Sequence, residues 1–496
     1  MNYISTRDKA KEKYTAAFVI KKGLAEDGGL FVPEKIPSVS ADDIKNLCKD
    51  TYPVRAAKIL SEYLTDYTYG ELLDDCSKAY AENSFPGGAA PVKHICDNMF
   101  SLELWHGPTA AFKDMALQVM PRLLSRALAK TGEDRTALIL VATSGDTGKA
   151  ALEGYKNIDK TKIMVFYPVD GVSRVQKLQM STQTGDNVNV CAIKGNFDDA
   201  QTGVKKIFSD SEAVKALNDK GYFFSSANSI NWGRLVPQIV YYISAYCDLV
   251  NNGSIKIGDE INVCVPTGNF GNIFAAYLAK LMGLPIKKLI CASNKNNVLT
   301  DFLKTGVYDR NRDFYCTMSP SMDILISSNL ERLLYFCAGA EKTARYMDSL
   351  KRNGKYEIDD GIKSLIDENF AGYFADETET AQTIRDYYVN HNYLIDTHTA
   401  VAVSCAEQYL KDTQEDNIPM LVVSTASPYK FAADVYCSIT SERPDDELEA
   451  LKMLSKYTSS EISYPLRGLE ERKVRFTHTA KPEDMLSEVY DYISKP

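Results

Sequence analysis

The feature that most constrains the fold is a repeated order of a short apolar run, a polar loop and an amphipathic stretch. Seven runs rich in β-branched and other apolar residues have the length of buried strands; they begin at residues 136, 162, 188, 222, 261, 288 and 419. Strands that alternate with helices form parallel sheets covered on both faces. Right-handed crossovers bring the loops after the strands to one edge, where ligands bind. We therefore expect an α/β fold with its site in those loops.

The two ends of the chain depart from this alternation. The first hundred residues hold helical stretches around the loop DGGLFVPEKIP, and a glycine-rich turn, SFPGGAA, closes them. The last fifty residues resemble a charged helix followed by a short α/β appendage. A chain of 496 residues is too long for one simple core and predicts two to three packed units. We expect an N-terminal region at 1–98, a main body at 99–440 and a C-terminal appendage at 441–496.

Composition excludes several classes of protein. The formal net charge is −9 and no run of lysine and arginine is long, so nucleic-acid binding is not expected, whereas a small anionic substrate stays open. No two of the 11 cysteines lie closer than Cys247 and Cys264, which excludes C-x-x-C signatures and fits reduced thiols in a cytoplasmic protein. The N-terminus lacks the apolar core of a secretory signal, and the longest apolar stretch contains Pro237 and Asp248. No membrane span is expected.

Histidines give no sign of a metal site. The chain has five, and none belongs to an H-E-x-x-H or similar pattern, so no metal ligand is predicted. Asp396 and His398, in DTHT, fit a structural hydrogen-bond cluster near the sheet edge, and the role of His398 stays open.

A dense group of special residues surrounds Lys113, in the segment HGPTAAFKD. Gly107 and Pro108 impose a turn, and Asp114 could cap the helix expected to follow. Lys113 would then stand at a helix entrance beside apolar Phe112. Both features lower the pKa of a lysine and favour its use as a Schiff-base former. The alternative is a solvated lysine on an exposed helix start, which is the commoner situation when spacing alone is considered.

Two glycines lie in the loop VPTGNFGN, residues 265–272, between a strand and a helix. Glycines in this position let backbone N–H groups approach an anion at the helix N-terminus. The spacing is not G-x-G-x-x-G, so no dinucleotide is implied. An ordinary strand-to-helix turn explains the pattern equally well.

The loop ATSGDTGK at 142–149 resembles a P-loop only superficially. Thr143 stands where the first glycine belongs, and Ala150 replaces the hydroxyl that would bind magnesium, so an NTPase is disfavoured. As a polar loop after a strand it could still hold a carboxylate or a phosphate.

Two further loops carry polar groups at strand ends. In STASPYKF, the hydroxyl of Thr425 could bind a ring nitrogen, although a helix cap by Ser424 or Ser427 is the simpler interpretation. In SANSINWGR, at 226–234, two amides and a guanidinium would suit an oxyanion, and a solvated helix entrance is the alternative.

Together and in this order, these segments resemble the threonine synthase family, in the branch of the bacterial and fungal enzymes. The resemblance begins at YISTR and DGGLFVP and continues through HGPTAAFKD, ATSGDTGKAA, SANSINWGR, PTGNFGN, DTHTAVA and STASPYKF. HGPTAAFKD is the most specific of these motifs and SGDTG the least. The family implies fold type II of the pyridoxal-phosphate enzymes: two open parallel-sheet lobes with the cofactor between them and an N-terminal region packed on them. The smaller lobe would be residues 130–225, approximately.

The resemblance also implies which residues hold pyridoxal 5'-phosphate. Lys113 would carry the cofactor and act in catalysis, and Thr425 would bind the ring nitrogen. Asp146 would lie beside the phenolic oxygen, where a carboxylate needs a proton or a cationic neighbour. The residues that would cradle the phosphate are Gly268, Asn269, Phe270, Gly271 and Asn272. The residues hypothesised to bind the substrate's carboxylate and phosphate are Thr109, Ser144, Thr147, Asn228, Asn231 and Arg234.

The family's reaction is the last step of threonine biosynthesis, in which a carbon–oxygen lyase converts O-phospho-L-homoserine and water to L-threonine and phosphate. Met115 stands where the serine and threonine dehydratases of this fold place arginine, and this favours the synthase. Two alternatives stay open: a phospho-lyase that releases a 2-oxo acid, ammonia and phosphate, and a catalytically silent relative that binds a metabolite. A monomer is preferred, and a dimer stays open.

Overall fold

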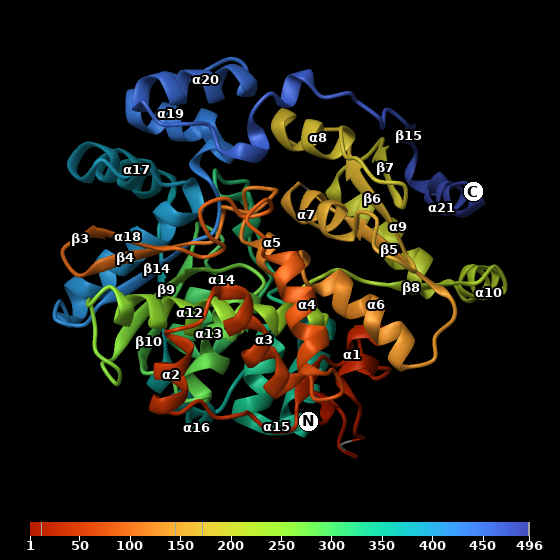
Figure 1. Ribbon diagram of the computed structural model, residues 1–496, viewed down its shortest axis with the longest axis horizontal. Helices are drawn as coiled ribbons and strands as arrows, with labels where there is room; N and C mark the ends of the chain where they lie inside the picture. The colour runs from red at the N-terminus through yellow and green to blue at the C-terminus, as the bar shows by residue number, and fades with distance from the viewer. Residues whose placement is uncertain (11, 144, 171, 495–496) are drawn as a thin grey trace.

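The computed structural model describes residues 1–10, 12–143, 145–170 and 172–494. Two separate β-sheets form the centres of two lobes that lie side by side (Figure 1). The N-terminal segment covers the lower side of the larger lobe in that view, and the C-terminal segment runs along the upper side of both. The expected α/β architecture with two parallel-sheet lobes is confirmed.

The larger lobe contains a six-stranded sheet in the order β13-β10-β9-β14-β4-β3. Its strands run parallel except β3, which pairs antiparallel with β4. Side chains alternate between the two faces: Val263 and Val423 pack towards α12 and α13, whereas Cys264 and Val422 pack towards α17 and α18. The strands are β3 (Val92–Cys96), β4 (Met99–Glu103), β9 (Ile261–Pro266), β10 (Ile286–Ser293), β13 (Phe370–Phe374) and β14 (Met420–Ser424).

Helices cover both faces of this sheet, as a parallel sheet requires. They are α5 (Lys113–Leu117), α11 (Trp232–Leu235), α12 (Pro237–Asn251), α13 (Gly271–Leu281), α14 (Val298–Thr305), α15 (Leu330–Asn353), α16 (Asp360–Asn369), α17 (Glu377–His391), α18 (Thr397–Thr413) and α19 (Ala432–Thr440). Two short 3-10 turns, η1 (Pro320–Met322) and η2 (Pro428–Phe431), and a small hairpin of β11 (Val307–Asp309) and β12 (Lys355–Glu357) complete the lobe.

The smaller lobe contains a five-stranded parallel sheet in the order β15-β7-β6-β5-β8. Ile139 faces the core shared with the larger lobe, and its neighbour Leu138 faces α9 and the C-terminal helix. The strands are β5 (Thr136–Ala142), β6 (Thr161–Pro168), β7 (Val188–Ile193), β8 (Tyr222–Ser225) and β15 (Thr479–Ala480). The helices are α6 (Met120–Lys130), α7 (Asp146–Tyr155), α8 (Arg174–Ser181), α9 (Phe197–Ser209) and α10 (Ser211–Asp219).

The N-terminal region packs on both lobes, as expected. Arg126 of α6 in the smaller lobe lies 2.6 Å from Asp75 of this region. Thr6 Oγ1 donates to Glu331 Oε1 over 2.6 Å, and Arg7 Nη2 lies 2.7 Å from Glu331 Oε2 at the start of α15. Trp232 Nε1 donates to the hydroxyl of Tyr3. The elements of the region are β1 (Tyr3–Ser5), α1 (Ala16–Lys22), β2 (Phe31–Pro33), α2 (Ala41–Leu47), α3 (Tyr52–Tyr63) and α4 (Tyr69–Ala79).

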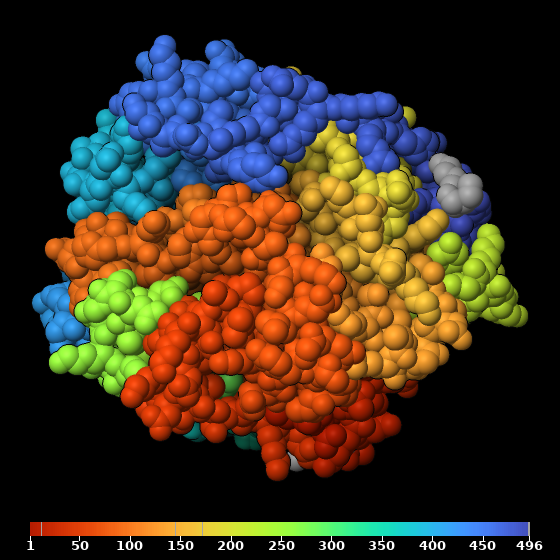
Figure 2. Space-filling view, in the orientation of Figure 1, coloured from red at the N-terminus to blue at the C-terminus, as the bar shows by residue number. Residues whose placement is uncertain are grey.

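The C-terminal segment lies across both lobes, and its atoms form a continuous band along the top of Figure 2. It begins beside α17 and α19, passes α8 and ends over the outer face of the smaller sheet. Its elements are α20 (Glu447–Thr458), η3 (Tyr464–Leu466), η4 (Leu469–Glu471), β15, η5 (Pro482–Asp484) and α21 (Met485–Ser494). The domain boundaries predicted at residues 98 and 440 stay predictions. Strand β3, which precedes residue 98, belongs to the large sheet, and strand β15, which follows residue 440, belongs to the small sheet.

All seven strands expected from apolar runs are present, as β5 to β10 and β14. Three strands of the large sheet were not predicted: β3 carries Lys93 and His94, β4 carries Ser101 and Glu103, and β13 has Gly372 at its centre. Among the described residues, every helix is too short or too polar to cross a membrane.

Candidate active site

Lys113 is the first residue of α5, and its surroundings differ from those of a surface lysine. It is 8% exposed, and its Nζ donates to Ser321 Oγ over 3.2 Å and lies 3.6 Å from Asp146 Oδ2. Burial lowers the pKa of Lys113 to about 8; Asp146 opposes this change, while Lys430 and Arg234 reinforce it. The expected helix entrance and lowered pKa are confirmed, and the solvated alternative is wrong.

Asp114 does not cap a helix, so that prediction was wrong. It lies inside the first turn of α5 and accepts hydrogen bonds from the backbone N–H and the hydroxyl of Thr109, each over 2.8 Å. These two hydrogen bonds connect Thr109, just after the turn at Gly107 and Pro108, to Asp114 at the start of the helix. They fix the direction in which the chain enters α5, and therefore the position of Lys113.

Asp146 is the first residue of α7 and the most strongly paired carboxylate near Lys113. Its Oδ1 lies 2.9 Å from Lys430 Nζ and accepts a hydrogen bond from Gln176 Nε2 over 2.7 Å. Burial by itself raises the pKa of Asp146, but the ammonium groups of Lys430 and Lys113 outweigh it and hold that pKa well below its usual range. Lys430 is therefore the cationic neighbour that a carboxylate at this position was expected to need.

The loops that carry Lys113 and Lys430 are joined by backbone hydrogen bonds. Phe112 N donates to Thr425 O over 2.8 Å, and Ser427 N donates to Ala110 O over 3.1 Å. Lys430 Nζ adds a bond of 2.8 Å to Thr109 O. The segments HGPTAAFKD and STASPYKF thus form one unit at the carboxyl end of β14 and β4. In this unit Ser427 caps η2 as predicted, whereas Ser424 remains in β14 and accepts from Trp105 Nε1.

The loop between β9 and α13 presents unused backbone donors. Among the hydrogen bonds formed by the described residues, none uses the backbone N–H groups of residues 268–272 as donors. Phe270 adopts φ +61°, which turns the chain into the helix, and the carbonyls of Gly268 and Asn269 accept from Ser327 and Asn329 instead. A concave row of free N–H groups at a helix N-terminus fits the phosphate of a cofactor.

Asn272 supplies an independent sign of an anion site. Its Oδ1 accepts hydrogen bonds from the hydroxyls of Tyr241 and Tyr242, which orient the amide. Its Nδ2 is buried and has no partner among the described residues. A buried donor without an acceptor is costly, so the amide is suited to a ligand oxygen.

Thr425 directly follows β14 and is 5% exposed, and its hydroxyl makes no hydrogen bond within the part of the chain that the structure describes. The hydroxyl can donate to or accept from a ring nitrogen. The free N–H row, the unpaired amide and this hydroxyl, together with buried Lys113, are the groups that pyridoxal phosphate needs from a protein.

The six residues hypothesised to bind substrate fall into three groups. Thr109 and Asn231 are fully buried, and their side chains bind within the protein: Thr109 to Asp114, Asn231 to Ile20 O and Gly233 N. Thr147, Asn228 and Arg234 have polar groups left for a ligand; Arg234 Nη1 donates to Ala227 O, and burial lowers its pKa to about 10. Ser144 lies outside the described residues.

Sequence reasoning missed three residues of this site, which are Ser321, Gln176 and Lys430. Ser321 has its N–H bound to His398 Nε2 over 3.1 Å, and His398 Nδ1 lies 3.0 Å from Asp396 Oδ1. The predicted hydrogen-bond cluster at DTHT is thus present, and it holds Ser321 against Lys113. Only Lys430 left a signal in the sequence, because it lies in a recognised motif and Asp146 required a cation.

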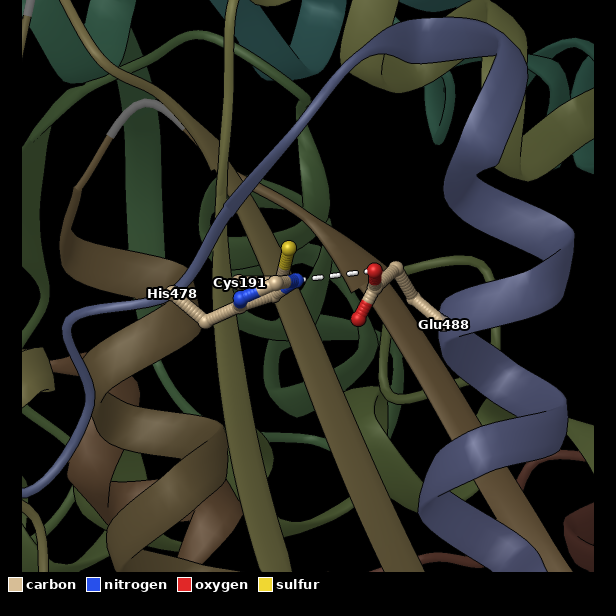
Figure 3. Close-up of side chains that lie close together, drawn as sticks. All are labelled: Cys191, His478 and Glu488. Atoms are coloured by element: carbon tan, nitrogen blue, oxygen red, sulfur yellow. Dashed lines mark hydrogen bonds and ion pairs between the residues drawn. The ribbon is translucent and has the colours of Figure 1, made fainter.

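A second cluster of reactive groups lies away from this site, where the C-terminal segment covers β7 (Figure 3). The ligand atoms of Cys191, His478 and Glu488 all lie within 4.8 Å of one another, and His478 Nε2 is 2.8 Å from Glu488 Oε1. Thiol, imidazole and carboxylate are zinc ligands in type. These three residues are far apart in the sequence and form no metal-binding motif, so no sequence pattern could have predicted that they come together. Burial raises the pKa of the Cys191 thiol to about 12, which keeps it protonated without a cation.

Three family profiles match the chain in succession. "Threonine synthase N terminus" matches residues 2–80, "Pyridoxal-phosphate dependent enzyme" matches 92–425, and "Threonine synthase, C-terminal" matches 399–493. The middle profile covers all six strands of the larger sheet and four of the five strands of the smaller sheet, and it ends at Thr425.

Individual relatives give the same picture. Human "Threonine synthase-like 1" is 41% identical over 449 residues, which are 87% of this chain and 60% of that protein. This chain therefore spans about 60% of the length of that relative. "Threonine synthase" of Pseudomonas aeruginosa is 38% identical over 440 residues, covering 87% of this chain and 89% of that protein. The crystal structure of PLP-bound threonine synthase from Brucella melitensis superposes with a TM-score of 0.88 at 36% identity, over 99% of this chain and 98% of that one.

The matched profiles, the relatives and the shared fold agree with the groups found around Lys113. The chain has the fold type II architecture of the pyridoxal-phosphate-dependent enzymes, and it belongs to the threonine synthase family.

Proposed function

We propose that this enzyme converts O-phospho-L-homoserine and water to L-threonine and phosphate. The observation that carries the proposal is the combination of a buried lysine, Lys113, with the unused N–H groups of residues 268–272 and the charge pair of Asp146 and Lys430. The relatives named threonine synthase, with which the chain shares its whole architecture, support the choice of reaction.

In this proposal each group has one task towards the cofactor. Lys113 holds it covalently, and residues 268–272 with the free amide of Asn272 bind its phosphate. Thr425 would offer its hydroxyl to the ring nitrogen, and a hydroxyl partner would leave that nitrogen without a full positive charge. Asp146 would face the phenolic oxygen, and Lys430 offsets the charge of this carboxylate. When bound, pyridoxal phosphate spreads over its ring the negative charge that develops on substrate carbon.

Lys113 also moves the protons of the reaction. With the substrate amine in its place, Lys113 Nζ would be a free amine that can accept a proton from Cα, release it, and then accept one from Cβ, and the electrons of that Cβ–H bond would expel phosphate from Cγ. Protons return to Cγ and Cα, and the hydroxyl of a water molecule adds at Cβ, which gives threonine. A pKa of about 8 suits these exchanges, because the amine can gain and lose a proton near neutral pH.

Arg234 is the main candidate for holding the anionic groups of the substrate. It is buried near Lys113, and its remaining guanidinium donors can bind a carboxylate or a phosphate in a forked geometry. Thr147 and Asn228 complete the proposed set. Thr109 and Asn231 support these residues through the internal bonds described above, and Ser144 remains part of the hypothesis.

A second candidate is a phospho-lyase that releases phosphate, ammonia and a 2-oxo acid from the same substrate. The observation in its favour is that relatives 41% identical to this chain are named threonine synthase-like. The two reactions share every step up to the loss of phosphate, and they differ in whether water adds at Cβ before the amine is lost.

One experiment separates these possibilities. The purified enzyme with pyridoxal phosphate is incubated with O-phospho-L-homoserine, and phosphate, threonine and 2-oxobutyrate are quantified. Phosphate with an equal amount of threonine supports the synthase, and phosphate with 2-oxobutyrate supports the lyase. The matched control is Lys113→Ala, in which all three products should fall to background. If none of the products forms with the parent enzyme although the cofactor is bound, both candidates are rejected in favour of a silent relative.

A further inference from the structure

Two lysines compete for one carboxylate at the centre of the site. Lys430 Nζ lies 2.9 Å from Asp146 Oδ1, whereas Lys113 Nζ lies 3.6 Å from Asp146 Oδ2. The Lys430 side chain is 0% exposed and is held by a second bond, to Thr109 O. Lys430 is therefore the closer and better anchored of the two ammonium groups.

We propose that Lys430 is a positioning residue that occupies Asp146 and so leaves Lys113 free to act as a neutral amine. This inference rests on the proposed use of Lys113 as the cofactor lysine. A lysine locked as an ammonium in a buried ion pair cannot attack the cofactor's aldehyde, because its nitrogen lone pair is occupied by a proton.

The surroundings of Lys113 explain why it is the one to lose its proton. The charged groups near it are Asp146 on α7, Lys430 on η2 and Arg234 on α11, and His398 on α18 acts on Asp146. One carboxylate balances one ammonium. With Lys430 and Arg234 both charged, a third cation at Lys113 would be an excess positive charge in a buried site, which is costly. Lys113 is therefore the group that loses its proton, because its contact with Asp146 is the longer of the two lysine contacts.

Other contacts around Asp146 also favour a charged Lys430 and a neutral Lys113. Asp146 Oδ1 receives both Lys430 and the amide of Gln176, whereas Oδ2 faces Lys113 and the hydroxyl of Ser321. The Phe112 ring, whose centroid lies 5.2 Å from Lys113 Nζ, attracts an ammonium group more weakly than a carboxylate in contact does. Removal of Lys430 would leave Lys113 as the sole close ammonium beside Asp146 within the described site, and would convert a neutral amine into one half of an ion pair.

The test measures how fast apoprotein captures pyridoxal phosphate as a function of pH, followed by the absorbance of the bound cofactor, with no substrate present. In the parent protein the rate should rise with pH through a midpoint near 8. In Lys430→Met the midpoint should move up by about one unit or more, the size of effect expected from an opposite charge in contact. Capture at pH 7 should then be slower by about tenfold or more. Lys430→Arg, which keeps the charge, should stay close to the parent.

The decisive control is the double variant Asp146→Asn/Lys430→Met. With the carboxylate also gone, Lys113 has no partner to hold its proton, so the midpoint should return to the parent value or below. An unchanged midpoint in Lys430→Met, or a double variant that stays at the raised midpoint, would overturn the proposal. Lys430→Gln, which can keep a hydrogen bond to Thr109 O, replaces the methionine variant if that variant does not fold.

Failure of this inference can be told apart from failure of the proposed function. The capture assay contains no phosphohomoserine, so its outcome does not depend on which product the enzyme forms. Borohydride reduction followed by peptide mapping shows whether the cofactor is joined to Lys113. Attachment elsewhere rejects the premise; attachment at Lys113 without a shift in Lys430→Met rejects only the role of Lys430.

Discussion

The smaller lobe meets its neighbours through ion pairs at two very different depths. Asp146 of α7 meets Lys430 of the larger lobe with 4% and 0% of the two side chains exposed. Arg174 of α8 meets Asp446, just before α20 of the C-terminal segment, with 59% and 34% exposed. Both contacts join a carboxylate to a cation across a boundary between two parts of the chain.

The difference in depth decides what each contact can do. Water stabilises Arg174 and Asp446 whether or not they meet, so their contact adds little to the free energy of folding. Asp146 and Lys430 have no water to replace a lost partner, so each depends on the other and on the hydrogen bonds around them. A buried pair can therefore set the protonation of its neighbours, which an exposed pair cannot.

The largest expected effect comes from breaking the buried pair. Asp146→Ala leaves the ammonium of Lys430 in a buried site without a carboxylate, and this should lower the free energy of unfolding by about 3–5 kcal/mol. Urea denaturation of the protein with bound cofactor measures the change. The double variant Asp146→Asn/Lys430→Met removes both charges and should lose clearly less. If the double variant is as unstable as Asp146→Ala, packing rather than charge accounts for the loss.

The next largest effect is expected at Asp114, which is buried like Asp146. Asp114 accepts hydrogen bonds from Thr109, whereas Asp146 is in contact with the ammonium group of Lys430. Burial raises its pKa to about 6 from an ordinary value of 3.8. Since the folded protein binds this proton more tightly than the unfolded chain, the associated stability is present below about pH 4 and is lost as the pH rises through about 6.

Asp114→Asn should therefore be more stable than the parent above pH 6, by at most about 3 kcal/mol, and equal to it near pH 4. The amide can accept from Thr109 N–H and donate to Thr109 Oγ1, so both contacts survive. Unfolding midpoints between pH 4 and 8 test this. A constant difference across that range would show that Asp114 does not titrate as its burial implies.

The features that could be predicted from sequence are those that depend on residues adjacent in the chain. Strands such as β5 and β9 were predictable because apolar runs of the right length can only be buried, and the loops after them had to meet at one edge. Lys113 and the loop at 265–272 were found through motifs in those loops. In each case the information lies in residues adjacent in the chain.

Contacts between distant segments could not be predicted in this way. Lys430 lies in η2, which follows a strand of the larger sheet, and Asp146 begins α7, which follows a strand of the smaller sheet, so nothing local specifies which cation meets which carboxylate. Ser321 lies in a short 3-10 turn with no motif, and Thr109, expected at the substrate, is directed inwards to Asp114. Local pattern identifies the loops, and tertiary packing decides which side chain of a loop faces the site.

A smaller effect is expected where Gly154 of α7 packs against Leu117 of α5. A Cβ added to Gly154 would stand 1.8 Å from Leu117 O, so Gly154→Ala must push the two helices apart. We expect a loss of about 1–3 kcal/mol in unfolding free energy, with slower cofactor capture because Asp146 moves away from Lys113. The matched control is Gly70→Ala on α4, where the new Cβ meets nothing within 4 Å. If Gly154→Ala is as stable as Gly70→Ala, α5 and α7 can move apart without a loss of stability, and the prediction is wrong.

The smallest effect should come from the exposed pair. Arg174→Gln removes the contact with Asp446, but it also removes a positive charge from the first turn of α8, where the helix dipole disfavours cations. The two changes oppose each other in a solvated place, so the thermal midpoint should move by no more than about 1 °C, and still less in high salt. Asp446→Ala should lower it more, because Asp446 also accepts from the N–H groups of Leu448 and Glu449 and caps α20. A drop in Arg174→Gln as large as that in Asp446→Ala would show that the contact between the two parts stabilises the fold in spite of its exposure, and the distinction drawn here between buried and exposed pairs would not hold.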